Sequence, residues 1–254
     1  MKKLLAITAL SAALFFGQTA AAEEKAAEEV KPSHVEMVLV LDESGSMSDL
    51  TRDTIGGFNS MIEKEKKLDV DAHVTTVLFN DQYKMLYNRR ELKDVSKMTD
   101  KDYTPGGMTA LLDAVGRTIH KMDMVAGIHR KDKGNKVLFV IITDGEENDS
   151  KEYTYADVKK LIKDRQENAG WEFIFLGANI DAAAAAENLG IDRDRAVKYK
   201  NTGSGVRANF MAVAELSDSL AKSGRVSDEW KETVEKDEDD AADKQSAAVT
   251  SHRR

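Results

Sequence analysis

The sequence predicts an α/β fold: a doubly wound, mostly parallel sheet of six strands with helices on both faces. Short apolar runs alternate along the chain with segments whose apolar residues recur at helical spacing, which is the pattern of such a sheet. The most apolar run of the domain, residues 137–142, is typical of a central strand buried on both faces. The more polar run at residues 83–90 follows the turn signal Asn80-Asp81 and is expected to return as an edge strand.

The first two strands and the helix between them are each marked by a local pattern. Residues 35–41 form a mostly apolar run and are predicted to be a buried strand. A helix is expected over residues 48–66, where Phe58 and Ile62 lie on an apolar stripe. Residues 73–79 are rich in β-branched side chains and are predicted to be the next strand.

The remaining elements alternate in the same way. Apolar residues at helical spacing predict a helix over residues 109–125, ahead of the central strand. The elements expected after that strand are a helix at residues 155–168, a strand at 171–176, a short helix between the cap Asp181 and the stop Gly190, a weak strand at 196–199 and a last helix at 206–222. No internal repeat is visible, so the series is predicted to form one domain.

Length and composition set the class of protein. The chain has 254 residues, 41% of them hydrophobic, which is enough for one domain with a sizeable core. Its formal net charge of −8 argues against nucleic acid as a partner, because binding to phosphates requires a basic surface. The chain contains no cysteine, so neither a disulfide nor a thiol-linked lipid is expected.

Four segments are expected along the chain. Residues 1–22 have the three parts of a secretory signal peptide: the basic pair Lys2 and Lys3, a short apolar stretch and an Ala-x-Ala ending. The apolar stretch is too short to span a bilayer, so cleavage after Ala22 and export to the periplasm or the medium, without a membrane span, are expected. The other segments are predicted to be a linker at residues 23–34, the domain at 35–223 and a disordered acidic tail at 224–254, in which only Trp230 is suited to local docking.

Oxygen-bearing side chains directly follow the first strand. Asp42, Ser44 and Ser46 alternate in the run Asp42-Glu43-Ser44-Gly45-Ser46, at the strand end where open α/β sheets place their ligands. Carboxylate and hydroxyl oxygens suit Mg²⁺, Mn²⁺ or Ca²⁺ better than a thiophilic metal. The same residue types are ordinary in a tight turn, so this run alone leaves both interpretations open.

Two further loops supply donors of the same kind. Thr109 ends the loop that begins at Thr104, and the paired glycines Gly106 and Gly107 allow its backbone a close approach. Asp144 directly follows the most apolar strand. Taken alone, the Thr109 loop is better explained as an ordinary capped helix, and the Asp-Gly after the strand is commonly just a turn. If the first and the most apolar strands are neighbours, however, all three loops meet above one crevice and a cation site is predicted.

With these residues in this order, the chain resembles the von Willebrand factor A (VWA) domain and its metal-ion-dependent adhesion site. That site is written as Asp-x-Ser-x-Ser, a distant Thr and a distant Asp. The matching residues are Asp42, Ser44, Ser46, Thr109 and Asp144, without substitution. The resemblance covers residues 35–223 and implies one antiparallel edge strand, which fits residues 83–90.

The resemblance also implies how such a site works. Ser44, Ser46 and, when ligand is bound, Thr109 would coordinate a divalent cation, usually Mg²⁺, with Mn²⁺ or Ca²⁺ as alternatives. Asp42 and Asp144 would act through waters or as hydrogen-bond partners that orient the hydroxyls. Because neutral hydroxyls leave most of the cation's charge unneutralised, an Asp or Glu of a partner protein would complete the shell. The expected function is therefore metal-dependent protein binding, in adhesion or complex assembly, and not catalysis. The sequence selects neither a particular partner nor an oligomeric state.

Two other functions stay open beside this one. A metal-dependent phosphatase similar to the haloacid dehalogenases would use Asp42 as its nucleophile. That family requires a second carboxylate two residues later, where this chain has Ser44. A structural scaffold would instead make its contacts through the acidic tail.

The other acidic residues and the histidines near these motifs are weaker candidates. Asp49, Glu146, Glu147 and Asp149 could rim the site or hold a second ion, but a helix N-terminus for Asp49 and a solvated loop for the others explain them better. The five histidines are scattered, and none has metal-ligand spacing. They are expected to be ordinary surface or core residues, with His34 in a flexible end.

Overall fold

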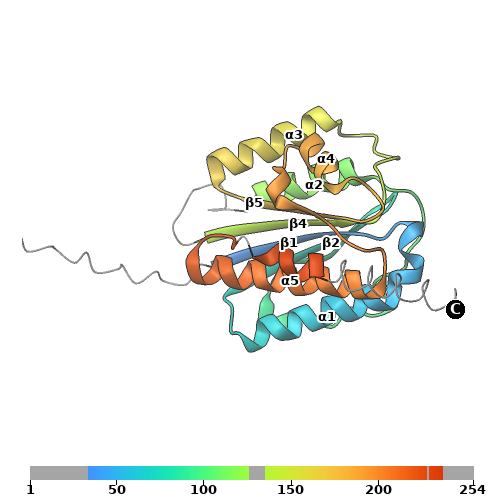
Figure 1. Cartoon of the computed structure of the whole chain (residues 1–254). Coiled ribbons are helices and arrows are strands. Elements are labelled where there is room, and N and C mark those ends of the chain that lie inside the picture. The colour runs from blue at the N-terminus through green and yellow to red at the C-terminus, as the bar shows by residue number, and fades with distance from the viewer. Residues whose placement is uncertain (1–33, 126–134, 228, 237–254) are drawn as a thin grey trace, which may run out of the picture.

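The computed structural model describes residues 34–125, 135–227 and 229–236, and these form a six-stranded sheet in the order β3-β2-β1-β4-β5-β6 (Figure 1). The strands are β1 (His34–Asp42), β2 (Ala72–Phe79), β3 (Tyr83–Glu91), β4 (Asn135–Thr143), β5 (Glu172–Gly177) and β6 (Ala196–Lys198). Only the pair β2–β3 is antiparallel; every other neighbouring pair is parallel. The predicted fold class is confirmed, including the antiparallel edge strand.

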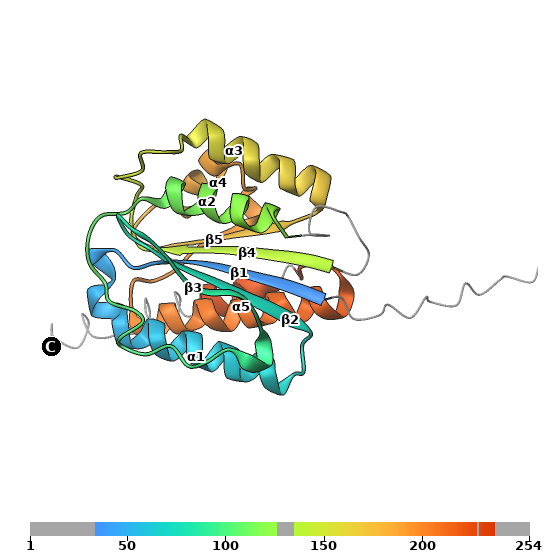
Figure 2. The same ribbon diagram turned by 180° about the vertical axis from the view of Figure 1, so that it is seen from behind.

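Helices cover both faces of the sheet, as Figures 1 and 2 show from opposite sides. The α-helices are α1 (Thr51–Lys67), α2 (Leu111–Asp123), α3 (Tyr155–Asp164), α4 (Ala182–Leu189) and α5 (Gly203–Ser223). Helices α1 and α5 lie on one face, and α2, α3 and α4 lie on the other. The expected cap Asp181 and stop Gly190 bound α4, where Asp181 accepts from the backbone N–H of Ala184 and Gly190 has a φ of 86°.

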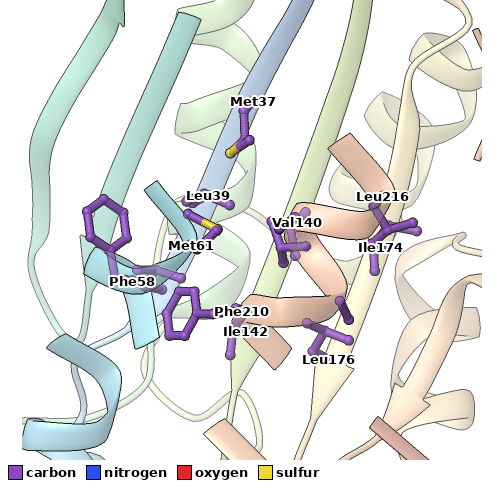
Figure 3. Close-up of a cluster of buried hydrophobic side chains, with 14 of the residues drawn as sticks. Met37, Leu39, Phe58, Met61, Val140, Ile142, Ile174, Leu176, Phe210 and Leu216 are labelled. Atoms are coloured by element: carbon purple, nitrogen blue, oxygen red, sulfur yellow. The ribbon is translucent and has the colours of Figure 1, made fainter. Parts of the chain in front are cut away.

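The core consists of two layers, one on each side of the sheet. Because side chains alternate along a strand, Leu138 and Val140 of β4 face the α1 and α5 side, while Val137 and Phe139 face the α2 side. Figure 3 shows the first layer, in which Phe210 of α5 lies among side chains from β1, β4, β5 and α1. Burying one such large apolar side chain stabilises a fold by about 1.5–3 kcal/mol, so these layers hold the sheet between its helices.

Two boundaries differ from the sequence-based expectation at the start of the domain. The segment Gly45–Leu50 is a separate 3₁₀ helix (η1), and α1 begins only at Thr51. The hydroxyl of Ser48 donates to the carbonyl of Gly45 at 2.7 Å, a local bond that competes with α-helical pairing. His34 was expected in a flexible end, but it is the first residue of β1 because it pairs with Asn135 of β4.

The chain continues to pack against the core beyond Ser223, where the sequence places the end of the domain. After Gly224, which has a φ of 68° and ends α5, the chain packs back onto the α1 and α5 layer. Val226, Trp230 and Val234 are all buried there, and Trp230 is only 1% exposed. The expected docking of Trp230 is thus observed. The expectations for residues 1–33 and 237–254, which are the signal peptide, most of the linker and most of the acidic tail, lie outside the described residues.

Among the described residues, no helix has the length and apolarity that crossing a membrane requires.

Candidate metal centre at the carboxyl edge of the sheet

Strands β1 and β4 are parallel neighbours at the centre of the sheet, with Leu41 paired to Ile142. The chain leaves β1 toward α1 on one face and leaves β4 toward α3 on the other (Figure 1). This divergence makes the β1–β4 boundary the topological switch point, which is where open α/β sheets place their ligands. The sequence predicted that the loops meet if the first strand and the most apolar strand are neighbours. Strands β1 and β4 are neighbours, so the loops that follow them lie side by side.

Asp42, the last residue of β1, is almost fully buried and both of its carboxylate oxygens accept hydrogen bonds. Its Oδ1 accepts from the backbone N–H of Ser44 at 2.7 Å, and its Oδ2 accepts from Thr143 Oγ1 at 2.6 Å. Burial raises the pKa of the Asp42 carboxyl, and the bonds from Ser44 and Thr143 partly oppose that effect. Asp42 therefore holds the β1 loop and the end of β4 in register.

The hydroxyls of Ser44 and Ser46 lie 3.1 Å apart. Ser46 Oγ also donates to Asp144 Oδ1 at 2.5 Å, although 98 residues separate the two in sequence. Adjacent ligands of an octahedral Mg²⁺ ion, each about 2.1 Å from the metal, lie about 3.0 Å apart. The hydroxyl spacing fits two such positions, and all the donors present are the hard oxygens that this class of cation prefers.

Thr109 approaches the same point from the third loop. Its backbone N–H donates to Asn148 Oδ1 at 2.8 Å, and its carbonyl accepts from the N–H of Asn148 at 3.0 Å. A Cβ placed on Gly145 would lie 3.7 Å from Thr109 Oγ1 and 3.9 Å from Ser46 Oγ, so these two hydroxyls line one small space. The structure therefore brings all five predicted residues together.

Backbone hydrogen bonds join the glycine loop to the loop after β1. Gly45 N–H donates to the carbonyl of Gly107 at 3.2 Å, and Gly106 N–H donates to the carbonyl of Glu43 at 2.9 Å. Gly107 has a φ of 77°, in the left-handed region that favours glycine. Of the paired glycines, Gly107 serves the close approach that the sequence predicted, whereas Gly106 has open space around it and contributes its backbone N–H. The loop so formed carries Thr109 to the site.

Three residues that support the site were missed by the sequence reasoning. Tyr103 is buried and donates from its hydroxyl to the carbonyl of Asp42 at 2.6 Å. Glu43 is also buried, accepts from the N–H of Thr104 at 2.5 Å and lies 3.6 Å from Lys84 Nζ. The third is Thr143, beside Asp42. Only for Glu43, a charged residue inside the motif next to a buried strand, did the sequence carry a usable signal.

The other acidic residues near the site differ in their contacts and exposure. Glu147 was expected on a solvated loop or at the rim of the site, but its carboxylate accepts from the backbone N–H groups of Leu112, Asp149 and Ser150 at 2.7–3.0 Å. It therefore caps the start of α2 and closes its own loop, because a carboxylate there satisfies unpaired helical N–H groups. Asp49 and Glu146 are exposed, and their proposed roles at the rim stay predictions.

The expectation that the histidines are scattered is corrected for His34 and His73. His34 and His73 lie beside Glu36 at the opposite edge of the sheet, with donor atoms in mutual contact. A signal was present, since His34 and Glu36 share one strand face at spacing i, i+2. Their contact with His73 depends on the pairing of β1 with β2, in which Glu36 faces His73.

The structure is thus an α/β domain with a doubly wound sheet, and hydroxyl and carboxylate oxygens gather at its switch point as a candidate site. The chain belongs to the von Willebrand factor A family: residues 34–199 match the family model vWA-TerF-like, described as the vWA found in the TerF C terminus. Domains of this family are typically protein-binding or adhesion modules, and they often bind a divalent metal. No curated protein sequence matches the chain.

Solved structures share the fold at low sequence identity. The pilus adhesin SpaC from Lactobacillus rhamnosus GG is 14% identical with a TM-score of 0.58, over 76% of this chain and 31% of its own. The vWF domain of the type V pili tip protein Mfa5 from Porphyromonas gingivalis is 12% identical with a TM-score of 0.53, over 78% of this chain and 99% of its own. A von Willebrand factor type A structure from Catenulispora acidiphila is 15% identical with a TM-score of 0.51, over 73% of this chain and 43% of its own. The chain thus spans less than half the length of SpaC and of the Catenulispora protein.

Proposed function

We propose that this chain is a divalent-metal-dependent protein-binding module. It captures an Asp or Glu side chain of a partner protein through Mg²⁺, with Mn²⁺ or Ca²⁺ as alternatives. The residues that would hold the cation are Asp42, Ser44, Ser46, Thr109 and Asp144. The observation that carries the proposal is the pair of Ser44 and Ser46 hydroxyls, 3.1 Å apart, with Asp144 hydrogen-bonded to one of them.

The residues of the site divide into two roles. Ser44, Ser46 and Thr109 offer neutral hydroxyl oxygens as ligands. Asp42 keeps both carboxylate oxygens engaged by Ser44 and Thr143, so it orients the loop, and Asp144 orients the Ser46 hydroxyl. A cation held mainly by hydroxyls keeps most of its positive charge and attracts an anionic oxygen from outside. Recognition of a carboxylate follows from that charge balance.

We further propose that the protein is exported and acts in the periplasm or outside the cell. Two observations support this: the signal-like residues 1–22 and the likeness in fold to a pilus adhesin and a pili tip protein. The net charge of −8 argues against nucleic acid as a partner. The partner is instead a protein that presents an acidic residue.

Isothermal titration tests the metal step. Mg²⁺ and Mn²⁺ are titrated into the unmodified chain, the Asp42→Ala variant and a control, Asp100→Ala, which changes an exposed carboxylate on another loop. The expected result is saturable binding to the unmodified chain and to the control, and loss of binding by Asp42→Ala. Absence of metal-dependent heat from the unmodified chain would contradict the proposal.

Capture of envelope proteins with and without EDTA tests the partner step. Binding that EDTA abolishes, that added Mg²⁺ restores and that Asp144→Ala lacks is the expected result. The two alternatives predict other outcomes. A hydrolase would turn over a generic phosphate ester in a reaction dependent on Asp42. A scaffold acting through its tail would lose capture on deletion of residues 237–254 and keep it in EDTA.

A further inference from the structure

We propose that His34, Glu36 and His73 form a second metal site, which takes an ion of the zinc class at the edge of the sheet opposite the hydroxyl site. The two sites are at the two ends of β1, which runs from His34 to Asp42. The inference stands on its own residues and does not depend on the proposed function.

Strand geometry places the three side chains together. His34 and Glu36 are two residues apart on β1 and project from the same face of the sheet. His73 of β2 is the register partner of Glu36 in the parallel pairing. The position is therefore built on paired strands of the central sheet, which hold donor atoms more rigidly than loops do.

The three donor atoms form a triangle of the size that zinc requires. His34 Nε2 lies 2.8 Å from His73 Nδ1 and 3.3 Å from Glu36 Oε1, and His73 Nδ1 lies 3.2 Å from the same oxygen. Ligands about 2.0–2.1 Å from a tetrahedral zinc ion lie about 3.3 Å from one another. The two edges to Glu36 match one face of that tetrahedron, and the edge between the rings would lengthen by about 0.5 Å on metal binding, with a fourth position left for water.

Partners around the triangle orient two of the three ligands. His34 Nδ1 lies 3.0 Å from Asp71 Oδ1, so the ring donates there and directs Nε2 toward the cluster. Arg89 Nε donates to Glu36 Oε2 at 3.0 Å and to Oε1 at 3.2 Å, and this pairing holds the carboxylate with Oε1 beside the two rings. A carboxylate on the outer nitrogen of a histidine is the usual support of a metal ligand, because it fixes the tautomer and the ring orientation.

The short contact between the two rings requires a proton or a metal ion between their facing nitrogens. Two imidazole nitrogens 2.8 Å apart cannot both direct lone pairs at each other, so a proton or a metal ion must lie between them. Arg89 Nη2, 3.2 Å from His73 Nδ1 and also bonded to Glu36 Oε1, contributes further positive charge. The metal would replace the shared proton and displace Nη2, while the Arg89 Nε bond to Glu36 Oε2 is compatible with metal bound at Oε1.

An ion can reach the cluster from solvent. His34 and His73 line an open depression that also holds the acidic Asp69 and Asp71, while its Glu91 pairs with Lys93 at 2.7 Å. These charges raise the local concentration of cations. Two imidazoles with one carboxylate favour zinc or a neighbouring transition metal, whereas Mg²⁺ and Ca²⁺ favour oxygen ligands alone. The two sites, one at each end of β1, would therefore bind different metals.

The test uses the untagged chain in excess Mg²⁺, titrated with Zn²⁺ by calorimetry and with Co²⁺ by visible absorption. The expected result is one saturable site, with the intense visible bands of tetrahedral Co²⁺, that His73→Ala weakens at least tenfold. Asp42→Ala is expected to leave this binding unchanged, which separates the site from the proposed Mg²⁺ site. His120→Ala, which changes an exposed histidine of α2, is the matched control.

Two further variants keep the test decisive if His73→Ala fails to fold. Asp71 is largely exposed, so Asp71→Asn is expected to preserve the fold and to weaken Zn²⁺ binding about 10–100-fold through the orientation of His34. Arg89→Met removes the competing guanidinium and is expected to tighten binding. The proposal is overturned if the unmodified chain shows no saturable Zn²⁺ binding, or if His73→Ala and Asp71→Asn both bind Zn²⁺ as tightly as the unmodified chain does.

Discussion

Thr143 Oγ1 donates a 2.6 Å hydrogen bond to Asp42 Oδ2 and so ties the carboxyl end of β4 to that of β1. Both residues are buried, and 101 positions separate them in sequence. Thr143 is not part of the Asp-x-Ser-x-Ser run, yet it fixes the carboxylate that orients Ser44. The preorganisation of the proposed metal site therefore depends on a residue outside its motif.

Replacing Thr143 by valine tests that dependence. Valine keeps the shape but removes the donor, so Asp42 loses one partner while it stays buried. We expect a loss of about 1–3 kcal/mol in the free energy of unfolding, measured by urea denaturation. Mg²⁺ affinity, measured by calorimetry, should fall about 10–100-fold because the carboxylate is no longer fixed. The serine variant, which restores a hydroxyl, should recover most of that affinity; equal weakness of serine and valine would argue against the hydrogen bond as the cause.

We predict different outcomes when Gly106 and Gly107 are each replaced by alanine. Gly107 has a φ of 77°, and an added Cβ would lie 2.0 Å from Asp81 Oδ1, so Gly107→Ala must strain the loop and move Asp81. We expect it to lower the stability by about 1–3 kcal/mol and to weaken metal binding by displacing Thr109. Around Gly106 an added Cβ meets no atom within 4 Å, so Gly106→Ala should change both thermal stability and metal affinity little. Similar losses in the two variants would show that the positive φ of Gly107 is not what matters.

The buried carboxyl of Glu65 in α1 should make the stability of the fold depend on pH. It is fully buried beside Ser217 of α5, which donates to it at 2.8 Å, and burial raises the pKa of its carboxyl to about 7. Below pH 4.5 the group is protonated in both the folded and the unfolded state. Between pH 4.5 and 7 only the unfolded state ionises, so stability falls as pH rises, by about 3 kcal/mol in total.

Glu65→Gln should abolish that loss. The unfolding free energy of the variant minus that of the unmodified chain should therefore rise between pH 4 and 8, measured by urea denaturation at each pH. Glu63→Gln, which changes an exposed glutamate on the same helix, is the control and should leave the difference flat. A flat difference for Glu65→Gln as well would mean that Glu65 is ionised in the folded protein at neutral pH.

The burial of Trp230 indicates that the folded unit extends past α5. Its side chain is 1% exposed and belongs to the core layer of α1 and α5. Trp230→Ala should lower the free energy of unfolding by about 3–5 kcal/mol. Glu229→Ala changes an exposed neighbour and should have an effect within about 0.5 kcal/mol, measured in the same thermal and urea experiments. If the two variants were equally stable, Trp230 would not be part of the core in solution.

Most of the fold was predictable because its signals are local. The apolar run at residues 137–142 and the polar return at residues 83–90 each report the environment of one strand, and both predictions are confirmed. The tail was harder, because a predominantly acidic segment conceals single buried anchors such as Trp230 and Val234. A few buried side chains among many charged ones leave no average signal in composition.

The sequence by itself determined the strand and helix pattern, and it singled out Asp42, Ser44, Ser46, Thr109 and Asp144 as the candidate donors of the proposed site, whose oxygens suit a hard cation. Tertiary structure alone decided that these loops meet, that Thr143 holds Asp42, and that His34 contacts His73. The reason is physical. Periodicity along a chain records which face of an element is buried, whereas contact between distant residues depends on strand order and register, which no local pattern contains.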